Sequence, residues 1–164
     1  MSHQPMPQSE VEDRLWKAIE HGQHTGMLGV SGGGHFQPMT AFVERESNTI
    51  WFFTYRDTDL AEAVQAGGRA TFIVQQDDLW ACLDGRISLD HDRARMDRFW
   101  NPHVAAWYPE GKDDPRLALL RLDCQEAGVW LSDAGPVKYA WEVAKANVSK
   151  STPDIGERRD INLH

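Results

Sequence analysis

The segment Ile50–Tyr55, with the sequence IWFFTY, is apolar or aromatic on both faces of the strand that it predicts. Successive side chains of a strand point to opposite sides, so Ile50 and Phe52 share one face, whereas Trp51 and Phe53 share the other. An apolar face is stable only when other parts of the chain cover it. We therefore expect packing on both faces of this strand.

The remaining pattern indicates an antiparallel α+β protein that is mainly β. Roughly six or seven strands and three or four short helices are predicted, and they do not alternate as in a doubly wound sheet, so a barrel is favoured. The predicted strands lie within 25–55, 69–90, 116–124 and 127–133, with Gly85 as a candidate bulge, and the helices within 9–22, 57–68, 91–100 and 136–150. Residues 101–115 read as a loop.

The length of 164 residues fits one domain with its own core. We place this single domain at residues 9–150, after a disordered N-terminus at 1–8. The tail, residues 151–164, is polar and shows no periodic apolar pattern, so it is expected to be loose or to wrap the surface.

Charge and cysteine content limit the partners and the compartment. The formal net charge of −8 argues against nucleic acid and against an anionic membrane surface, because both are bound mainly through Lys and Arg. No apolar run approaches the length of a membrane span, and the first residues do not resemble a secretion signal. Cys82 and Cys124 form no C-x-x-C pair and are expected to be buried free thiols. A cytoplasmic protein is therefore expected.

Most candidate catalytic patterns favour ordinary structure. Residues 31–35, SGGGH, lack the lysine of a phosphate loop and favour a hairpin loop. The histidines show no metal-ligand spacing, so a metal or haem site would need residues that only the fold brings together. No Ser or Cys lies in a nucleophile motif. We therefore predict no metal site and name no catalytic residue.

The junction Thr54–Leu60 is the best local candidate for a binding site. A strand runs there into a predicted helix, whose first N–H groups favour an anion, and Arg56 could add a bidentate contact. In the alternative interpretation, which is the commoner one, Asp57 or Thr58 caps the helix and Arg56 is solvated.

Several blocks together resemble a known family. They are LWKAIEHGQHTGMLGV, QPMTAFVE, IWFFTYRD, WNPHVAAWYPEGKDDPRLALLRLD and VWLSDAGPVKYAWEVAKA, which span most of residues 11–160. The chain is identified on these blocks as similar to the bacterial general stress proteins of the FMN-binding split-barrel superfamily that includes pyridoxamine 5′-phosphate oxidase. The block from Trp100 to Leu122 is the most specific of them.

This resemblance implies a six-stranded antiparallel split β-barrel that forms a homodimer and binds FMN in clefts between the subunits. In such proteins the strand that matches QPMT follows the flavin ring, the segment that matches FFTYRD contacts ring and phosphate, and an aromatic residue of the partner approaches the ring edge. A flavin-linked redox role is implied, in which the cofactor carries the electrons. The cofactor-binding residues that it implies are Pro38, Met39, Phe53, Thr54, Tyr55, Arg56, Trp130 and Lys138.

Two positions depart from the family pattern. Relatives commonly have Arg where this chain has Gln37 and commonly have Lys where it has Leu60. Both replacements remove a cation from the expected phosphate end. An alternative hypothesis is therefore a split-barrel dimer without cofactor that binds another small ligand or partner.

Overall fold

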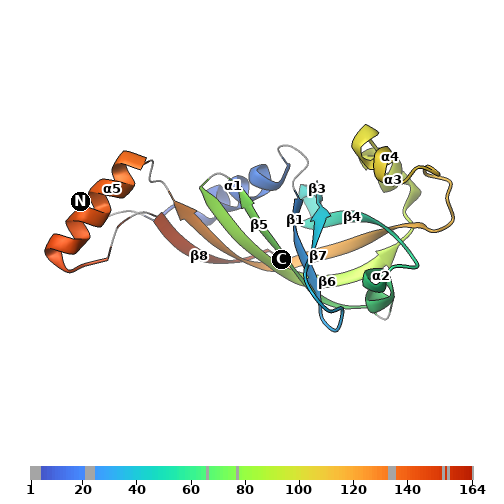
Figure 1. Cartoon of the computed structure of the whole chain (residues 1–164), viewed down its shortest axis with the longest axis horizontal. Coiled ribbons are helices and arrows are strands. Elements are labelled where there is room, and N and C mark those ends of the chain that lie inside the picture. The colour runs from blue at the N-terminus through green and yellow to red at the C-terminus, as the bar shows by residue number, and fades with distance from the viewer. Residues whose placement is uncertain are drawn as a thin grey trace.

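One antiparallel sheet dominates the computed structural model of the protein, with short helices around it (Figure 1). The structure describes residues 5–20, 25–65, 67–76, 78–132, 136–152, 154 and 156–163. The strands of the described residues are β1 (Thr25–Val30), β2 (Gln37–Thr40), β3 (Phe42–Glu44), β4 (Thr49–Tyr55), β5 (Gly68–Gln76), β6 (Leu79–Asp90), β7 (Leu117–Ser132) and β8 (Gly156–Asn162). The α-helices are α1 (Gln8–Glu20), α2 (Asp59–Val64), α3 (Arg93–Phe99), α4 (Pro102–Trp107) and α5 (Pro136–Ser149).

The two end strands of the sheet are joined directly by the chain, through one buried residue. Hydrogen-bonded neighbours follow the order β2-β1-β5-β6-β7-β4-β3, and β8 joins β7. The two ends of this order, β2 and β3, are separated in the chain by Ala41 alone. The predicted mainly β, antiparallel split-barrel class is therefore confirmed. The described chain has eight strands rather than six, because Ala41 divides β2 from β3 and because β8 is added.

Strand β4 separates two hydrophobic cores. Ile50 and Phe52 belong to the larger core, which is closed by the apolar face of α1. Trp51 and Phe53 belong to a smaller cluster with residues of α3, α4 and β7. None of the four side chains is more than 5% exposed. The predicted packing on both faces is confirmed, and each fully buried aromatic ring contributes about 1.5–3 kcal/mol.

Strand β7 is one continuous strand of 16 residues, although the sequence predicts two. Residues 117–123 pair with β4 and residues 126–132 pair with β8, both on the edge opposite β6. The polar residues between these parts hide the continuity. The expected bulge is present, because the register of β6 against β7 shifts between Asp84 and Gly85. A Cβ atom on Gly85 would lie 1.9 Å from the carbonyl oxygen of Asp123, so glycine is required.

The C-terminal residues join the sheet as β8, which sequence reasoning did not find. Ile161 and Leu163 are 3% and 4% exposed and belong to the main core. Arg158 and Asp160 on the same segment are exposed. The alternation is hidden in the sequence, because the four residues 157–160 are all charged.

Helix α5 extends beyond the ends of β7 and β8, at the left of Figure 1. Its apolar side chains Val137, Tyr139, Trp141 and Val148 are all more than half exposed. In the described part of the chain, no helix combines the length and the apolar character needed to cross a membrane.

Both cysteines are free thiols, but only one of them is buried. Cys124 is 4% exposed, and burial raises its pKa well above the ordinary range. Cys82 is partly exposed, and its pKa is also raised, first by burial and then by Asp84. The expected burial is confirmed for Cys124 alone. A raised pKa disfavours the thiolate, so neither residue has the environment of a reactive cysteine.

A buried carboxylate attaches α3 to the sheet. Glu44, at the end of β3, is 5% exposed and accepts hydrogen bonds from Arg95 Nε at 2.6 Å and Nη2 at 2.9 Å. Ser47 Oγ donates a third bond at 2.8 Å. The guanidinium of Arg95 also lies 4.9 Å from the ring centre of Trp51. The bonds from Arg95 and Ser47 lower the pKa of Glu44 to about 2.

We expect Glu44→Gln to remove part of the acid sensitivity of the fold. The folded pKa of about 2 lies below the ordinary 4.5, so this carboxylate stabilises the protein above pH 4.5 and loses its contribution as the pH falls toward 2. Between pH 7 and pH 3, the free energy of unfolding in urea should fall by on the order of 2 kcal/mol more in the wild type than in the variant. Glu46→Gln, at an exposed residue 3.3 Å from Arg98, is the control and should resemble the wild type. Equal acid sensitivity in Glu44→Gln and wild type would contradict this assignment.

Candidate functional site

A groove lies beside β2 and β4, between helices α4 and α2. It has two adjoining lobes, which share Met39, Phe53, Tyr55 and Tyr108. The α4 lobe has a volume of about 490 Å³ and is completed by residues 25, 38, 40, 42, 103, 104 and 107. The α2 lobe has a volume of about 480 Å³ and is completed by residues 33, 35–37, 54 and 58–60. Both volumes are typical of small-molecule sites.

Most residues that the family resemblance nominates meet in this groove. Pro38 and Met39 lie on β2, and Phe53, Thr54 and Tyr55 form the last part of β4. The two strands are brought together because β2 continues into β3, which pairs with β4. Segments far apart in the sequence thus form one wall.

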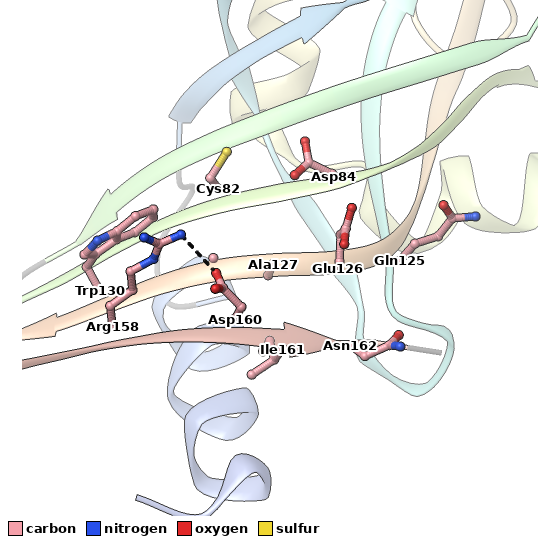
Figure 2. A pocket seen from close by; sticks show the side chains of 11 residues that line it. Cys82, Asp84, Gln125, Glu126, Ala127, Trp130, Arg158, Asp160, Ile161 and Asn162 are labelled. Atoms are coloured by element: carbon pink, nitrogen blue, oxygen red, sulfur yellow. Dashed lines mark ion pairs between the residues drawn. The ribbon is translucent and has the colours of Figure 1, made fainter. Parts of the chain in front are cut away.

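The other three nominated residues lie elsewhere in the chain. Arg56 is exposed and does not line the groove, and its Nη2 atom lies 3.2 Å from Nδ1 of His91. Trp130 lies on the far half of β7, beside Arg158, in an open trough on the outer face of the sheet (Figure 2). Lys138 lies on α5. Neither Trp130 nor Lys138 is among the residues that line the groove.

At the junction between β4 and α2, the structure agrees with the alternative interpretation, in which a side chain caps the helix. Thr58 Oγ1 accepts a hydrogen bond from the Ala61 N–H at 3.1 Å and donates one to the Tyr55 carbonyl at 3.0 Å. The hydroxyl of Thr54 lies 3.2 Å from that of Thr58. Leu60 is 5% exposed and packs in the main core. The two hydroxyl groups are thus already engaged within the fold, and Thr58 rather than Asp57 is the cap.

The groove is poor in positive charge. Among its described lining residues there is no Arg or Lys, and Asp59 in the α2 lobe brings a carboxylate. Arg116 stacks on Tyr55 at 4.4 Å from the ring centre, but it does not line either lobe and is paired with Asp114 at 3.1 Å. A ligand here would therefore be held mainly by apolar and neutral polar contacts.

Helix α4 supplies the wall that sequence reasoning missed, since residues 101–115 read as a loop. Asn101 Oδ1 accepts from the Val104 N–H at 2.8 Å and caps the helix, with Pro102 at its first turn. The dipeptide Asn-Pro was the available signal, because Asn favours the cap and Pro the next position. Two of the residues that α4 contributes, His103 and Trp107, line the α4 lobe.

Tyr108 attaches α4 to β4. Its hydroxyl donates to the Phe53 carbonyl at 2.8 Å, beyond the part of β4 that pairs with β3. Burial, with a smaller effect of Tyr55, raises the pKa of Tyr108 to about 12, so it remains a neutral donor at ordinary pH. The bond fixes the width of the groove at the residues that both lobes share.

Aromatic rings give the groove its chemical character. Phe42 and Phe53 meet edge to face at 5.5 Å between ring centres, and Tyr55 and Tyr108 do so at 4.9 Å. Such pairs hold each ring in a fixed orientation. Trp107 is 70% exposed at the rim and is available to stack on a ligand. The arrangement suits a planar aromatic ring.

Comparisons with known proteins agree with this fold. The sequence profile of the family described as "Pyridoxamine 5'-phosphate oxidase like" matches residues 10–154. A protein of Jannaschia sp. CCS1 assigned to general stress protein 26 is 32% identical, with 94% of this chain and 99% of that one covered and a TM-score of 0.79. The general stress FMN/FAD binding protein from Xanthomonas citri is 42% identical, with 77% and 92% covered and a TM-score of 0.71.

A more distant relative is protein bli-3 of Neurospora crassa, which is 25% identical over 91 residues. That match covers 51% of this chain and only 44% of the length of bli-3. The family profile, by contrast, extends over most of the chain, and the solved relatives share its fold over most of their length. The chain therefore belongs to the pyridoxamine 5′-phosphate oxidase-like family, in which it stands with the general stress proteins.

Proposed function

We propose that this protein binds a flavin of the FMN type in the groove beside β2 and β4 and takes part in flavin-linked redox chemistry. The observation that carries the proposal is the groove itself, in which Pro38, Met39, Phe53 and Tyr55 meet in an apolar, aromatic setting. The Xanthomonas citri relative, described as FMN/FAD binding, supports the same ligand class.

The lining residues fit the two ends of FMN unequally. The aromatic walls suit the isoalloxazine ring, whereas the described lining offers no Arg or Lys to a phosphate. A bound flavin would supply the electron-transfer chemistry. The residues of the chain would hold the ring, and Phe53 and Tyr108 would shield one side of it from water.

We further propose that the protein acts as a homodimer in which Trp130, and with it Lys138, reaches the partner's groove. The outer face of the sheet carries an exposed apolar row on adjacent strands: Met27, Ile73, Trp80 and Trp130 are 39–47% exposed. Met27 pairs with Ile73, and Trp80 pairs with Trp130. Ile73 itself pairs with Cys82, two residues from Trp80 along β6, so the two pairs are diagonal neighbours on one face of the sheet. Contiguous exposed apolar patches are typical of interfaces between proteins.

The lack of described cations in the groove favours one competing function. A split-barrel dimer without cofactor could use the same aromatic walls for another small, uncharged ligand. Flavin titration separates the two functions directly, because this second candidate binds neither FMN nor riboflavin.

Replacing Trp107 tests the flavin site. If the ring occupies the α4 lobe, Trp107→Ala should weaken flavin binding about three- to tenfold through lost stacking, whereas Trp107→Phe should stay within about twofold. The measurement is quenching of FMN and riboflavin fluorescence by the purified protein. Trp107 is 70% exposed, so thermal unfolding of both variants should match the wild type. No quenching by either flavin at about 100 µM would refute the flavin proposal and favour the cofactor-free one.

Replacing Ile73 tests the dimer. Ile73→Glu places a charge in the middle of the exposed row, so sedimentation should show a monomer where the wild type is a dimer. Flavin affinity should fall with it, because Trp130 of the partner is lost from the site. Ile73→Leu is the control and should leave both quantities unchanged. A wild type that sediments as a monomer, or an Ile73→Glu variant that stays dimeric, would be incompatible with this interface.

A further inference from the structure

We infer that the groove recognises the ring and polyol chain of a flavin but not a terminal phosphate, so that riboflavin binds at least as tightly as FMN. This inference rests on the flavin proposal above and deepens it, because it names the chemical class of flavin that the site selects. It concerns the α2 lobe, which contains the segment that the family resemblance assigns to the phosphate.

The α2 lobe does not offer the groups from which phosphate sites are built. Proteins bind phosphate mainly with Arg and Lys, often by bidentate hydrogen bonds. The described lining of this lobe has neither. Gln37 is a neutral amide, and Leu60 is an aliphatic side chain in the core. The hydroxyl of Thr58 is already held by Ala61 and Tyr55.

Two arginines adjoin the groove, Arg56 directly after β4 and Arg116 on the ring of Tyr55, and both have other partners. A guanidinium only donates, so Nδ1 of His91 must accept from Arg56, and the imidazole there is neutral. Burial and the nearby charge of Arg56 lower the pKa of His91, in agreement with this contact. Arg116 is paired with Asp114, whose side chain is 7% exposed. Neither arginine lines the groove.

The charge that the α2 lobe does contain is negative. Asp59 is exposed and lines this lobe. A phosphate monoester carries between one and two negative charges at pH 7, so the carboxylate and the phosphate repel each other. At low salt this repulsion extends over roughly 10 Å or more, and it weakens as salt is added. The hydroxyl that ends riboflavin meets no such penalty.

The neutral polar groups of the lobe suit a polyol chain. Gln37 presents an amide with both donors and an acceptor, and His35 presents an imidazole. Either group can exchange hydrogen bonds with hydroxyls without a charge on the ligand. The side chains that line the α2 lobe are therefore sufficient to favour a neutral polyol over a phosphate.

The test compares riboflavin and FMN on the full chain at pH 8, in about 20 mM and about 500 mM NaCl. We expect the dissociation constant of FMN to equal or exceed that of riboflavin at low salt. Added salt should tighten FMN binding and leave riboflavin binding unchanged.

A variant of Asp59 isolates the cause. Asp59→Asn should tighten FMN binding about three- to tenfold at low salt without changing riboflavin affinity, and Asp59→Lys should make FMN the tighter ligand. Asp113→Asn, which changes the net charge equally at a side chain 91% exposed and outside the groove, is the control and should have no effect.

The outcomes separate this inference from the flavin proposal. FMN binding that is tighter than riboflavin binding in the wild type at low salt would overturn the inference while leaving the flavin proposal intact. An unchanged FMN affinity in both Asp59 variants would also overturn it. Absence of binding by both flavins would overturn the flavin proposal itself.

Discussion

The burial of strand β4 on both faces is the constraint on which the rest of the structure depends. One face completes the main core beneath α1, and the other holds α3 and α4 against β7. A strand with only one apolar face would leave those two helices without a surface to cover. The groove exists because α4 packs on this second face and stops short of β2, where Pro38 and Met39 remain accessible. Core packing and ligand geometry are therefore set by the same six residues, 50–55.

Two polar contacts convert this packing into a defined shape. Glu44 and Arg95 fix α3 to the end of β3, and the Tyr108 hydroxyl fixes α4 to the Phe53 carbonyl. Each joins a partly exposed donor to an acceptor on a buried residue, so removing the donor would leave that acceptor without this hydrogen bond, at a cost of about 1–3 kcal/mol. Hydrophobic burial holds α3 and α4 against β4, and these two polar contacts determine the position of each helix.

The elements of the fold that a local sequence pattern specifies could be predicted from the sequence. The candidate site could be predicted only in part. Phe52 and Phe53 lie in a run that is apolar or aromatic on both faces of a strand, so β4 and its burial on both sides could be predicted from the sequence. Strand β8 could not, because its inward residue Ile161 comes after four successive charges. Helix α4 is only six residues long, and such a helix is specified by its Asn101 cap and by its contact with β4 more than by periodicity. For Arg56, sequence gave its place in the chain but not its direction, which depends on contact with His91.

The residues that stabilise α2 also determine what the neighbouring lobe can bind. Leu60 is drawn into the main core, and the Thr58 hydroxyl caps the helix, so two positions that could have contacted an anion serve the fold instead. Asp59, between them, is left at the surface with its carboxylate in the lobe. A cation at position 60 would replace a leucine that is 5% exposed and packs in the main core, so the lobe would gain a charge only with the loss of a buried apolar side chain. The preference for an uncharged ligand therefore follows from how this helix is held to the barrel.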